Sequence, residues 1–216
     1  MRSTRTLVAL AAAVLLTAGL AACGSGEPES TPAVEISGGQ TKPGTVLDDP
    51  KPKPALVLTD TKGKPYDLLK ETAGTTTLLF FGYTHCPDVC PTTMSDIALA
   101  KQRLPKAEQD KLRVVFVTTD PEHDTPKRLG EWLAAQDGDF IGLTGDFAAI
   151  QEAGRGVGVL VEKAEVDKDG TISADHGAQV LAFSPKDDKA HVIYTAGTTA
   201  EDYAKDLPVL IEGGTP

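Results

Sequence analysis

Two cysteines, Cys86 and Cys90, lie close together in the sequence, and each is followed by a proline. Only Pro87, Asp88 and Val89 separate them, and an apolar run precedes the pair. Such a pair can close a disulfide that staples the fold, work as a redox couple, or hold a metal ion between two thiolates. The gap leaves room for an ion between the sulfurs, so all three functions have to be weighed.

A purely structural disulfide is the weakest of these interpretations. A bridge stabilises a protein mainly by restricting the unfolded chain, and the loop between Cys86 and Cys90 is too short to restrict it much. A metal site would need more than the two sulfurs, because two soft thiolates alone leave the coordination of an ion incomplete. The metal interpretation therefore predicts a third ligand elsewhere in the chain.

The 4 histidines of the chain are the candidates for this third ligand. His85 precedes the first cysteine and is expected to face away from the second. His123 follows a predicted strand, His176 lies in a polar loop before another, and His191 begins a strand beside acidic residues. Ligands gather at the carboxyl ends of parallel strands, but this rule does not choose between His176 and His123. Taken singly, any of the four is more often exposed or structural.

The cysteines lie where a predicted strand passes into a predicted helix. Residues 75–83 are β-branched, Leu and Phe residues, apolar on both faces, which is typical of a central buried strand. A helix capped by Asp88 is expected after Cys86, because apolar residues then recur at helical spacing. Unpaired N–H groups and the positive end of the dipole favour thiolate at a helix N-terminus, so we expect acidic cysteines.

The rest of the pattern predicts alternating strands and helices. Residues 113–119 form a second apolar strand, and the order strand, helix, strand implies a parallel right-handed crossover. The other expected elements are hairpins over 55–59 with 65–68, 159–166 with 172 and 179–183 with 191–194, a strand over 140–143, and helices over 125–136, 146–154 and 199–210. This order predicts an α/β protein with a thioredoxin-like fold, in which helices flank a mixed sheet.

Residues 1–22 have the features of a secretory signal peptide, with Arg2 and Arg5, a short apolar run, and small residues before Cys23. A cysteine directly after the cleavage point resembles the lipobox of bacterial lipoproteins, which implies that Cys23 becomes the lipidated N-terminus. The folded part is then expected outside the cytoplasm, tethered to the cell membrane, where disulfides persist.

A flexible tether is predicted between this anchor and the folded domain. Residues 23–54 are rich in Gly, Pro, Ser and Thr, with few large apolar side chains, although residues 46–54 could already touch the domain. Residues 55–212 are predicted to be the domain itself. The formal net charge of the whole chain is −10, which excludes nucleic-acid binding by counterion release. Membrane attachment would rest on the lipid anchor rather than on anionic lipid.

Three segments of the chain together resemble the Sco/SenC family. Residues 81–94, FGYTHCPDVCPTTM, resemble its signature, residues 118–126, TTDPEHDTP, resemble its second motif, and Asp175-His176 resembles its third. They occur in the order of the family and in roughly the same places. Thioredoxin-type reductases, by contrast, have two residues rather than three between their cysteines.

The resemblance implies a thioredoxin-like protein that binds copper and helps to assemble the binuclear copper centre of cytochrome c oxidase. The two thiolate ligands of the family match Cys86 and Cys90, and its histidine ligand matches His176. Its aspartate in the second motif, an outer-shell or stabilising residue, matches Asp120. Two thiolates and one imidazole suit Cu(I) and keep Cu(II) possible, whereas structural zinc usually has a fourth protein ligand.

Two positions depart from the family pattern. Gly177 stands where the family often has Ser, and Ser184-Pro185 stands where it often has Asp-Pro. Neither position is a ligand, so the departures concern the surface that meets the partner.

Two functions are weighed. The preferred one is a membrane-anchored copper chaperone, which is not an enzyme. The alternative is a thiol–disulfide reductase that keeps the copper-ligand cysteines of the oxidase subunit reduced, with Cys86 and Cys90 as its catalytic redox pair. The expected partners are the copper-binding subunit of cytochrome c oxidase, other copper chaperones or a thiol reductant, and the membrane.

Overall fold

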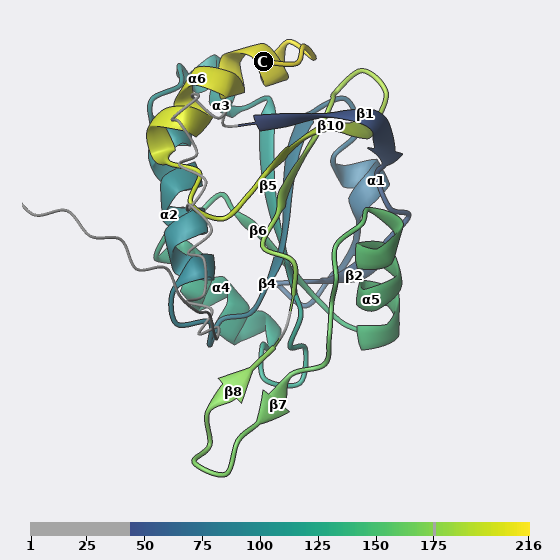
Figure 1. The fold of residues 1–216 in the computed structure, drawn as a ribbon, viewed down its shortest axis with the longest axis vertical. Coiled ribbons are helices and arrows are strands. Elements are labelled where there is room, and N and C mark those ends of the chain that lie inside the picture. Colours follow the sequence, from purple (N-terminus) through teal and green to yellow (C-terminus); the bar gives the residue numbers. More distant parts are fainter. Residues whose placement is uncertain (1–43, 175) are drawn as a thin grey trace, which may run out of the picture. The chain divides into compact units, whose positions relative to one another are not determined.

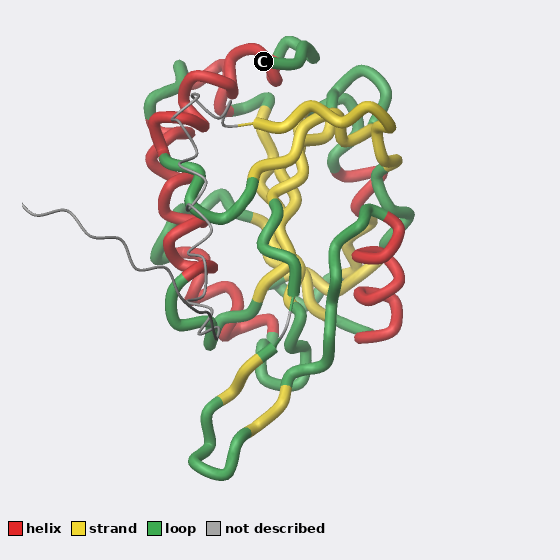
Figure 2. Tube along the Cα trace, in the orientation of Figure 1, coloured by secondary structure: helices red, strands yellow, loops and turns green. Residues whose placement is uncertain are grey.

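The computed structural model describes residues 44–174 and 176–216 of the chain. One sheet runs through this part, with strand order β1-β10-β9-β4-β5-β6-β2-β3, and β7 and β8 form a small sheet apart from it (Figures 1 and 2). The elements are β1 (Gly44–Pro52), β2 (Val57–Asp60), β3 (Pro65–Asp67), α1 (Leu68–Glu71), β4 (Thr76–Gly82), α2 (Val89–Gln102), α3 (Lys106–Gln109), β5 (Leu112–Thr118), α4 (Pro126–Ala134), β6 (Ile141–Thr144), α5 (Phe147–Gly156), β7 (Glu165–Val166), β8 (Ile172–Ser173), β9 (Val180–Phe183), β10 (Lys189–Tyr194) and α6 (Ala200–Ile211).

Strands β4 and β5 form the centre of the sheet. Every residue of β4 is buried, and the two strands pair in parallel from Thr76 opposite Leu112 to Gly82 opposite Thr118. Strand β6 continues the parallel part, whereas β9, β10 and β1 on one side and β2 and β3 on the other pair antiparallel. The mixed sheet confirms the predicted fold class.

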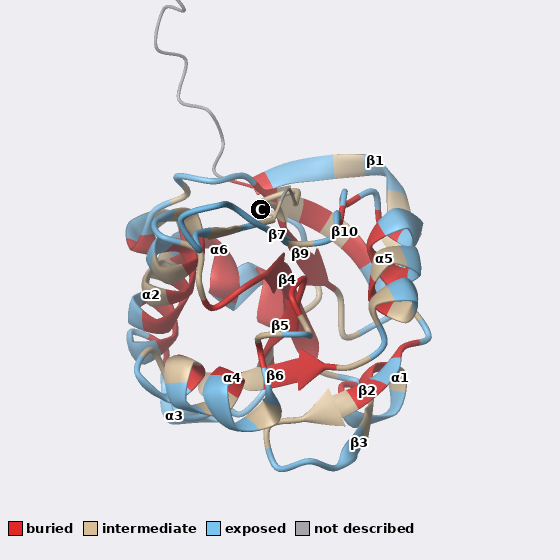
Figure 3. Ribbon diagram, turned by 90° about the horizontal axis from the view of Figure 1, so that it is seen from below, coloured by how far each residue is buried: buried red, intermediate tan, exposed pale blue. Residues whose placement is uncertain are grey.

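Helices cover both faces of the sheet, so the central strands must be apolar on both faces. Helices α2, α4 and α6 lie on one face and α1 and α5 on the other (Figures 1 and 3). Ile97, Leu129 and Leu207 belong to the buried cluster of the first face. Leu68 and Ile150 belong to the cluster of the second. Strand β4 contributes to both clusters, whereas Cys90 belongs to the first cluster and Cys86 packs against it.

Helices α2, α4 and α5 start where the sequence predicts, but only α4 and α5 have the side-chain hydrogen bond of a cap. Thr125 and Asp146 each accept a hydrogen bond from a backbone N–H in the first turn of their helix. Asp88 occupies the same position before α2, but its side chain accepts no such bond. Instead, the N–H of Cys90 donates to Cys86 Sγ, at an N···S distance of 3.4 Å. Asp88 is therefore at the predicted N-cap position, but the prediction that its side chain caps α2 is wrong, and a sulfur accepts a hydrogen bond in this turn instead.

The predicted tether extends too far into the chain. Its last residues form β1, which pairs antiparallel with β10 at the edge of the sheet. Lys53 follows, with its side chain buried and its Nζ 2.6 Å from the Asp188 carboxylate and 3.0 Å from Thr72 Oγ1. Composition misled the prediction because an edge strand with an irregular register pairs through its main chain and tolerates polar residues and proline.

Some of the predictions concern residues outside the described part of the chain. Residues 1–43, with the predicted signal peptide and Cys23, lie outside the described residues, as does Asp175. Among the residues that are described, no helix has the length and apolar character needed to cross a membrane. Helices α1 and α3 were not predicted, because each spans only four residues and shows no usable periodicity.

Candidate metal centre

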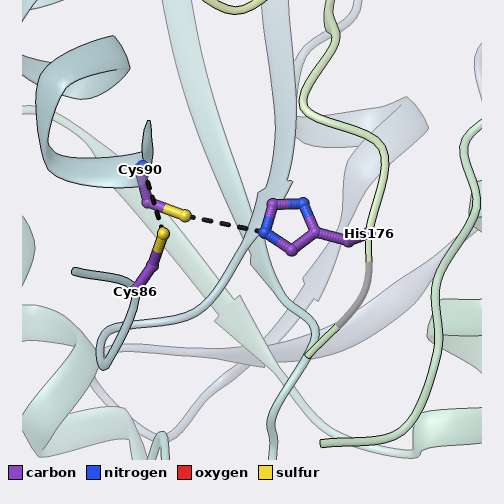
Figure 4. Close-up of side chains that lie close together, drawn as sticks. All are labelled: Cys86, Cys90 and His176. Carbon is purple, nitrogen blue, oxygen red and sulfur yellow. Dashed lines mark hydrogen bonds between the residues drawn. The ribbon is translucent and has the colours of Figure 1, made fainter. Parts of the chain in front are cut away.

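Cys86, Cys90 and His176 come together beyond the end of β4, where the chain enters α2 (Figure 4). Their ligand atoms all lie within 4.8 Å of one another, and Cys90 Sγ is 3.7 Å from His176 Nε2. Cys90 is buried, whereas Cys86 and His176 are partly exposed. The structure therefore assembles the three predicted ligands, although His176 is 86 residues away from Cys90 in the sequence.

Gly82, the last residue of β4, makes room for the Cys90 sulfur. A Cβ atom at this position would lie 2.9 Å from Cys90 Sγ and 2.8 Å from a ring carbon of Phe80, which is too close for non-bonded atoms. The carbonyl of Gly82 also accepts a hydrogen bond from the Thr119 N–H at 2.7 Å. The missing side chain thus lets the start of α2 pack directly against the end of β4.

The two thiols differ strongly in acidity. A hydrogen bond from the Cys90 thiol lowers the pKa of Cys86 to about 5 despite its partial burial, and the backbone N–H groups of Cys90 and Asp88 act in the same direction. The same hydrogen bond raises the pKa of Cys90, and burial raises it further. At neutral pH, Cys86 is a thiolate and Cys90 is the thiol that donates to it. The predicted acidity is confirmed for Cys86 and wrong for Cys90.

His176 presents one ring nitrogen to the sulfurs. Its Nδ1 lies 3.1 Å from the backbone oxygen of Gly177. Because a carbonyl can only accept, Nδ1 carries the proton, and in the neutral ring Nε2 keeps its lone pair for a ligand bond. The ring packs edge-on against Tyr83 and Phe80, with centroid distances of 5.7 and 6.1 Å, and the backbone bridges to Val161. The imidazole is therefore oriented by packing before any ion arrives.

Gly177, which follows His176, lies close to neighbouring side chains. A Cβ atom at Gly177 would lie 2.2 Å from Gln179 Oε1 and 3.2 Å from the side chain of Val159. A serine, frequent at this position in the resembling family, would collide with the glutamine as it is placed here. A side chain at residue 177 would therefore require the Gln179 side chain to move.

The other histidines have different neighbours. His123 Nδ1 lies 2.8 and 2.9 Å from the two carboxylate oxygens of Asp120, and His191 Nε2 lies 2.9 Å from the Asp187 carboxylate. His85 packs edge-on against His123, at a centroid distance of 6.0 Å. The geometry thus separates His176 from His123, which the sequence left as alternatives.

A second group of side chains supports the loop that carries the cysteines. Ligand atoms of His85, Asp120 and Asp124 lie within 4.8 Å of one another. Both carboxylates are buried, and both accept hydrogen bonds, Asp120 from His123 and Asp124 from Thr84. We therefore regard the group as a hydrogen-bonded support rather than as a metal centre. Sequence reasoning singled out Asp120 but missed Asp124, which contacts the cysteine loop directly.

The arrangement of the sulfurs and the imidazole suits a soft ion that needs few ligands. Metal bonds to thiolate and imidazole are about 2.0–2.3 Å long, so one ion can bridge donor atoms that lie within 4.8 Å of one another. Thiolates select Cu(I), and the imidazole also accommodates Cu(II). The same two sulfurs can instead close a disulfide, with loss of two electrons and of the one proton that the pair holds at neutral pH.

A model of the SCO1/SenC family matches residues 48–212 of the chain. The chain belongs to the SCO1/SenC family. The matched range includes both cysteines and His176, and it begins inside β1. Sequence comparison and structure thus agree that residues 48–54 belong to the SCO1/SenC domain.

Known proteins are similar to this chain in sequence and in fold. The apo Sco1 protein from Thermus thermophilus is 32% identical, with a TM-score of 0.67 over 80% of this chain and 99% of that one. Copper-bound ScoI of Bradyrhizobium japonicum is 34% identical, with a TM-score of 0.63 over 75% and 98%. The mitochondrial protein SCO1 homolog 1 of Arabidopsis thaliana is 33% identical over 52% of this chain and 34% of that protein. A putative copper-binding protein of Stutzerimonas stutzeri is 35% identical over 52% of this chain and 54% of that protein, so the chain spans about half the length, or less, of these two curated relatives.

Alkylation should distinguish the two thiols. At pH 7, iodoacetamide is expected to modify Cys86 much faster than Cys90, because a partly exposed thiolate reacts and a buried thiol does not. The Cys86 rate should fall only as the pH drops through about 5, rather than near 8.5 as for a free cysteine. Timed labelling with peptide mass spectrometry measures both sites.

Denatured protein is the control for this experiment. In denaturant, both cysteines should react at similar rates that rise near pH 8.5. Equal labelling of the two cysteines in the folded protein, or a folded-state rate at Cys86 that rises only above pH 8, would show that the thiols do not form this hydrogen-bonded pair.

Proposed function

We propose that the protein is a copper chaperone that binds Cu(I) through Cys86, Cys90 and His176. The observation that carries the proposal is the convergence of two sulfurs and one imidazole nitrogen within 4.8 Å. The similarity to ScoI of Bradyrhizobium japonicum, whose structure has copper bound, supports it. The recipient we propose is the copper-binding subunit of cytochrome c oxidase, in keeping with the role of the family.

The different acidities of the thiols determine how the ion is taken up. At neutral pH, Cys86 offers a thiolate directly, whereas Cys90 has to lose its proton when the metal binds. Uptake of one Cu(I) therefore releases about one proton, which comes from Cys90. Because Cys86 is more exposed than Cys90, a ligand of the partner approaches the ion from the side of Cys86. The buried Cys90 is then the last sulfur to release the ion.

Copper titration tests the ligand set. Reduced protein should bind Cu(I) in a single tight site, and Cys86→Ser or Cys90→Ser should weaken binding by more than about 100-fold, because a thiolate ligand is lost. His176→Ala should weaken binding by about tenfold or more, because one ligand is lost. The effect should be smaller than for the cysteine variants, because both thiolates remain. Anaerobic competition with a chromophoric Cu(I) chelator measures the affinities.

His191→Ala is the matched control for the titration. It removes a histidine that pairs with Asp187 on the β9–β10 hairpin, so it should bind Cu(I) as the parent does. Variants of Cys86, Cys90 and His176 that all bind as tightly as the parent would refute the proposed site.

A thiol–disulfide reductase is the second candidate, and the sulfur pair itself favours it. A thiolate beside a buried thiol suits a reaction in which one sulfur attacks and the other resolves. Cys86 would attack a disulfide of the oxidase subunit, forming a mixed disulfide and releasing one partner thiolate. Cys90 would then displace the second partner sulfur, leaving Cys86 and Cys90 joined and the partner reduced. A thiol reductant would restore the pair.

Anaerobic incubation with an apo oxidase copper domain separates the two functions. A chaperone transfers copper to a domain whose cysteines are already reduced, and this is the result we expect. A reductase instead reduces an oxidised domain without copper, and a Cys90→Ser variant then accumulates the mixed disulfide. Failure of copper transfer together with capture of that mixed disulfide would favour the second function.

We also propose that Cys23 carries a lipid that anchors the protein on the outer side of the cell membrane. The support lies in residues 1–22, whose basic start, apolar run and small residues lead to Cys23. Protein from isolated membranes should begin at Cys23 with the added mass of the lipid, and Cys23→Ser should move it to the soluble fraction. An unmodified Cys23 in the membrane-bound protein would contradict the proposal.

A further inference from the structure

We propose that Asp124 is a positioning residue that fixes the geometry of the two thiols, and that it does so through Thr84. The inference rests on the proposed copper site and adds a residue that the sequence did not single out. Asp124 is fully buried in the loop between β5 and α4, yet it contacts no sulfur through a hydrogen bond. Its hydrogen bonds lead instead to the segment between β4 and α2.

Asp124 holds Thr84 by two hydrogen bonds. The backbone N–H of Thr84 donates to Asp124 Oδ2 at 2.9 Å, and the Thr84 hydroxyl donates to Oδ1. Thr118 at the end of β5 donates its hydroxyl to Oδ2 at 2.7 Å. One carboxylate thus fastens the cysteine loop to the end of the neighbouring strand.

The backbone next to Thr84 contacts both cysteines. The residue before it, Tyr83, directs its backbone N–H to Cys90 Sγ, and its carbonyl accepts a hydrogen bond from the Cys86 N–H at 3.2 Å. A displacement of Thr84 would therefore move a donor to one sulfur and the backbone that carries the other. Because metal affinity depends on ligands that are held in place before binding, such a displacement weakens the site.

Arg128 completes the arrangement from the first turn of α4. Its Nε donates to the Thr84 hydroxyl oxygen at 2.7 Å and lies 3.8 Å from Asp124 Oδ1. The hydroxyl accepts from Arg128 through a lone pair and gives its own proton to Asp124, so the three groups orient one another. A carboxylate is required here because it only accepts, whereas an asparagine would turn an N–H₂ group toward one of these donors.

Cu(I) affinity and its dependence on Thr84 test the proposal. Asp124→Asn should weaken Cu(I) binding about 10- to 100-fold, the range typical of groups that orient metal ligands. Thr84→Val removes the hydroxyl at nearly constant shape and should also weaken binding. Thr84→Ser keeps the hydroxyl and should restore affinity to within about twofold of the parent. Anaerobic chelator competition on each folded variant, checked by circular dichroism, gives the values.

Asp206→Asn is the control for loss of stability alone. Asp206 is also a buried aspartate, but it lies in α6 and accepts a hydrogen bond from the Tyr194 hydroxyl at 3.0 Å. This variant should lose stability and keep the parent affinity. The inference is overturned if Asp124→Asn binds as tightly as the parent, or if Asp206→Asn weakens binding as much.

Two further results are informative. If Asp124→Asn does not fold, the Thr84→Val and Thr84→Ser pair decides, and equal affinities of these two variants would overturn the inference. If the parent itself binds no Cu(I), the proposed function fails before the role of Asp124 is tested. If the parent binds Cu(I) tightly and the variants of Asp124 and Thr84 bind it equally well, this inference fails and the proposed function stands.

Discussion

The site depends on one interaction, the hydrogen bond between the Cys90 thiol and the Cys86 thiolate at the start of α2. It lowers the pKa of Cys86 to about 5 and raises that of Cys90, so the pair shares one proton at neutral pH. The same Cys86 sulfur accepts the Cys90 N–H that a side-chain cap would otherwise take. A single sulfur thus accepts hydrogen bonds from the backbone at the start of α2 and from the Cys90 thiol, and it is also the metal donor that we propose. The bare backbone of Gly82 makes room for the Cys90 sulfur.

The topology of the sheet explains why distant segments meet at these sulfurs. Strands β4 and β5 run in parallel, so their carboxyl ends place the cysteine loop and the loop with Asp120 and Asp124 at one edge. Strand β9 runs antiparallel to β4, so the segment that precedes β9 lies at the same edge, and this segment carries His176. The order of the strands therefore brings three separate stretches of sequence to one place.

Much of this frame could be predicted from the sequence, because it depends on apolar periodicity. The strands predicted over residues 75–83 and 113–119 correspond to β4 (Thr76–Gly82) and β5 (Leu112–Thr118), and the cysteines follow the end of β4. Strand β1 could not be predicted, since its main-chain pairing with β10 leaves no apolar pattern. His176 and His123 could not be separated either, because both segments reach the same edge and only side-chain direction distinguishes them. For the same reason Asp120 and Asp124, four residues apart in one loop, have different neighbours that spacing does not reveal.

The central claim is that Cys86, Cys90 and His176 bind one Cu(I) ion together. X-ray absorption at the copper edge of the loaded, reduced protein tests it most directly, because it reports the number and type of the donor atoms. The structure predicts two sulfur neighbours and one nitrogen neighbour, with the nitrogen signal lost in His176→Ala and both sulfurs retained. A copper ion bound by nitrogen and oxygen alone, or a spectrum unchanged by His176→Ala, would contradict the account.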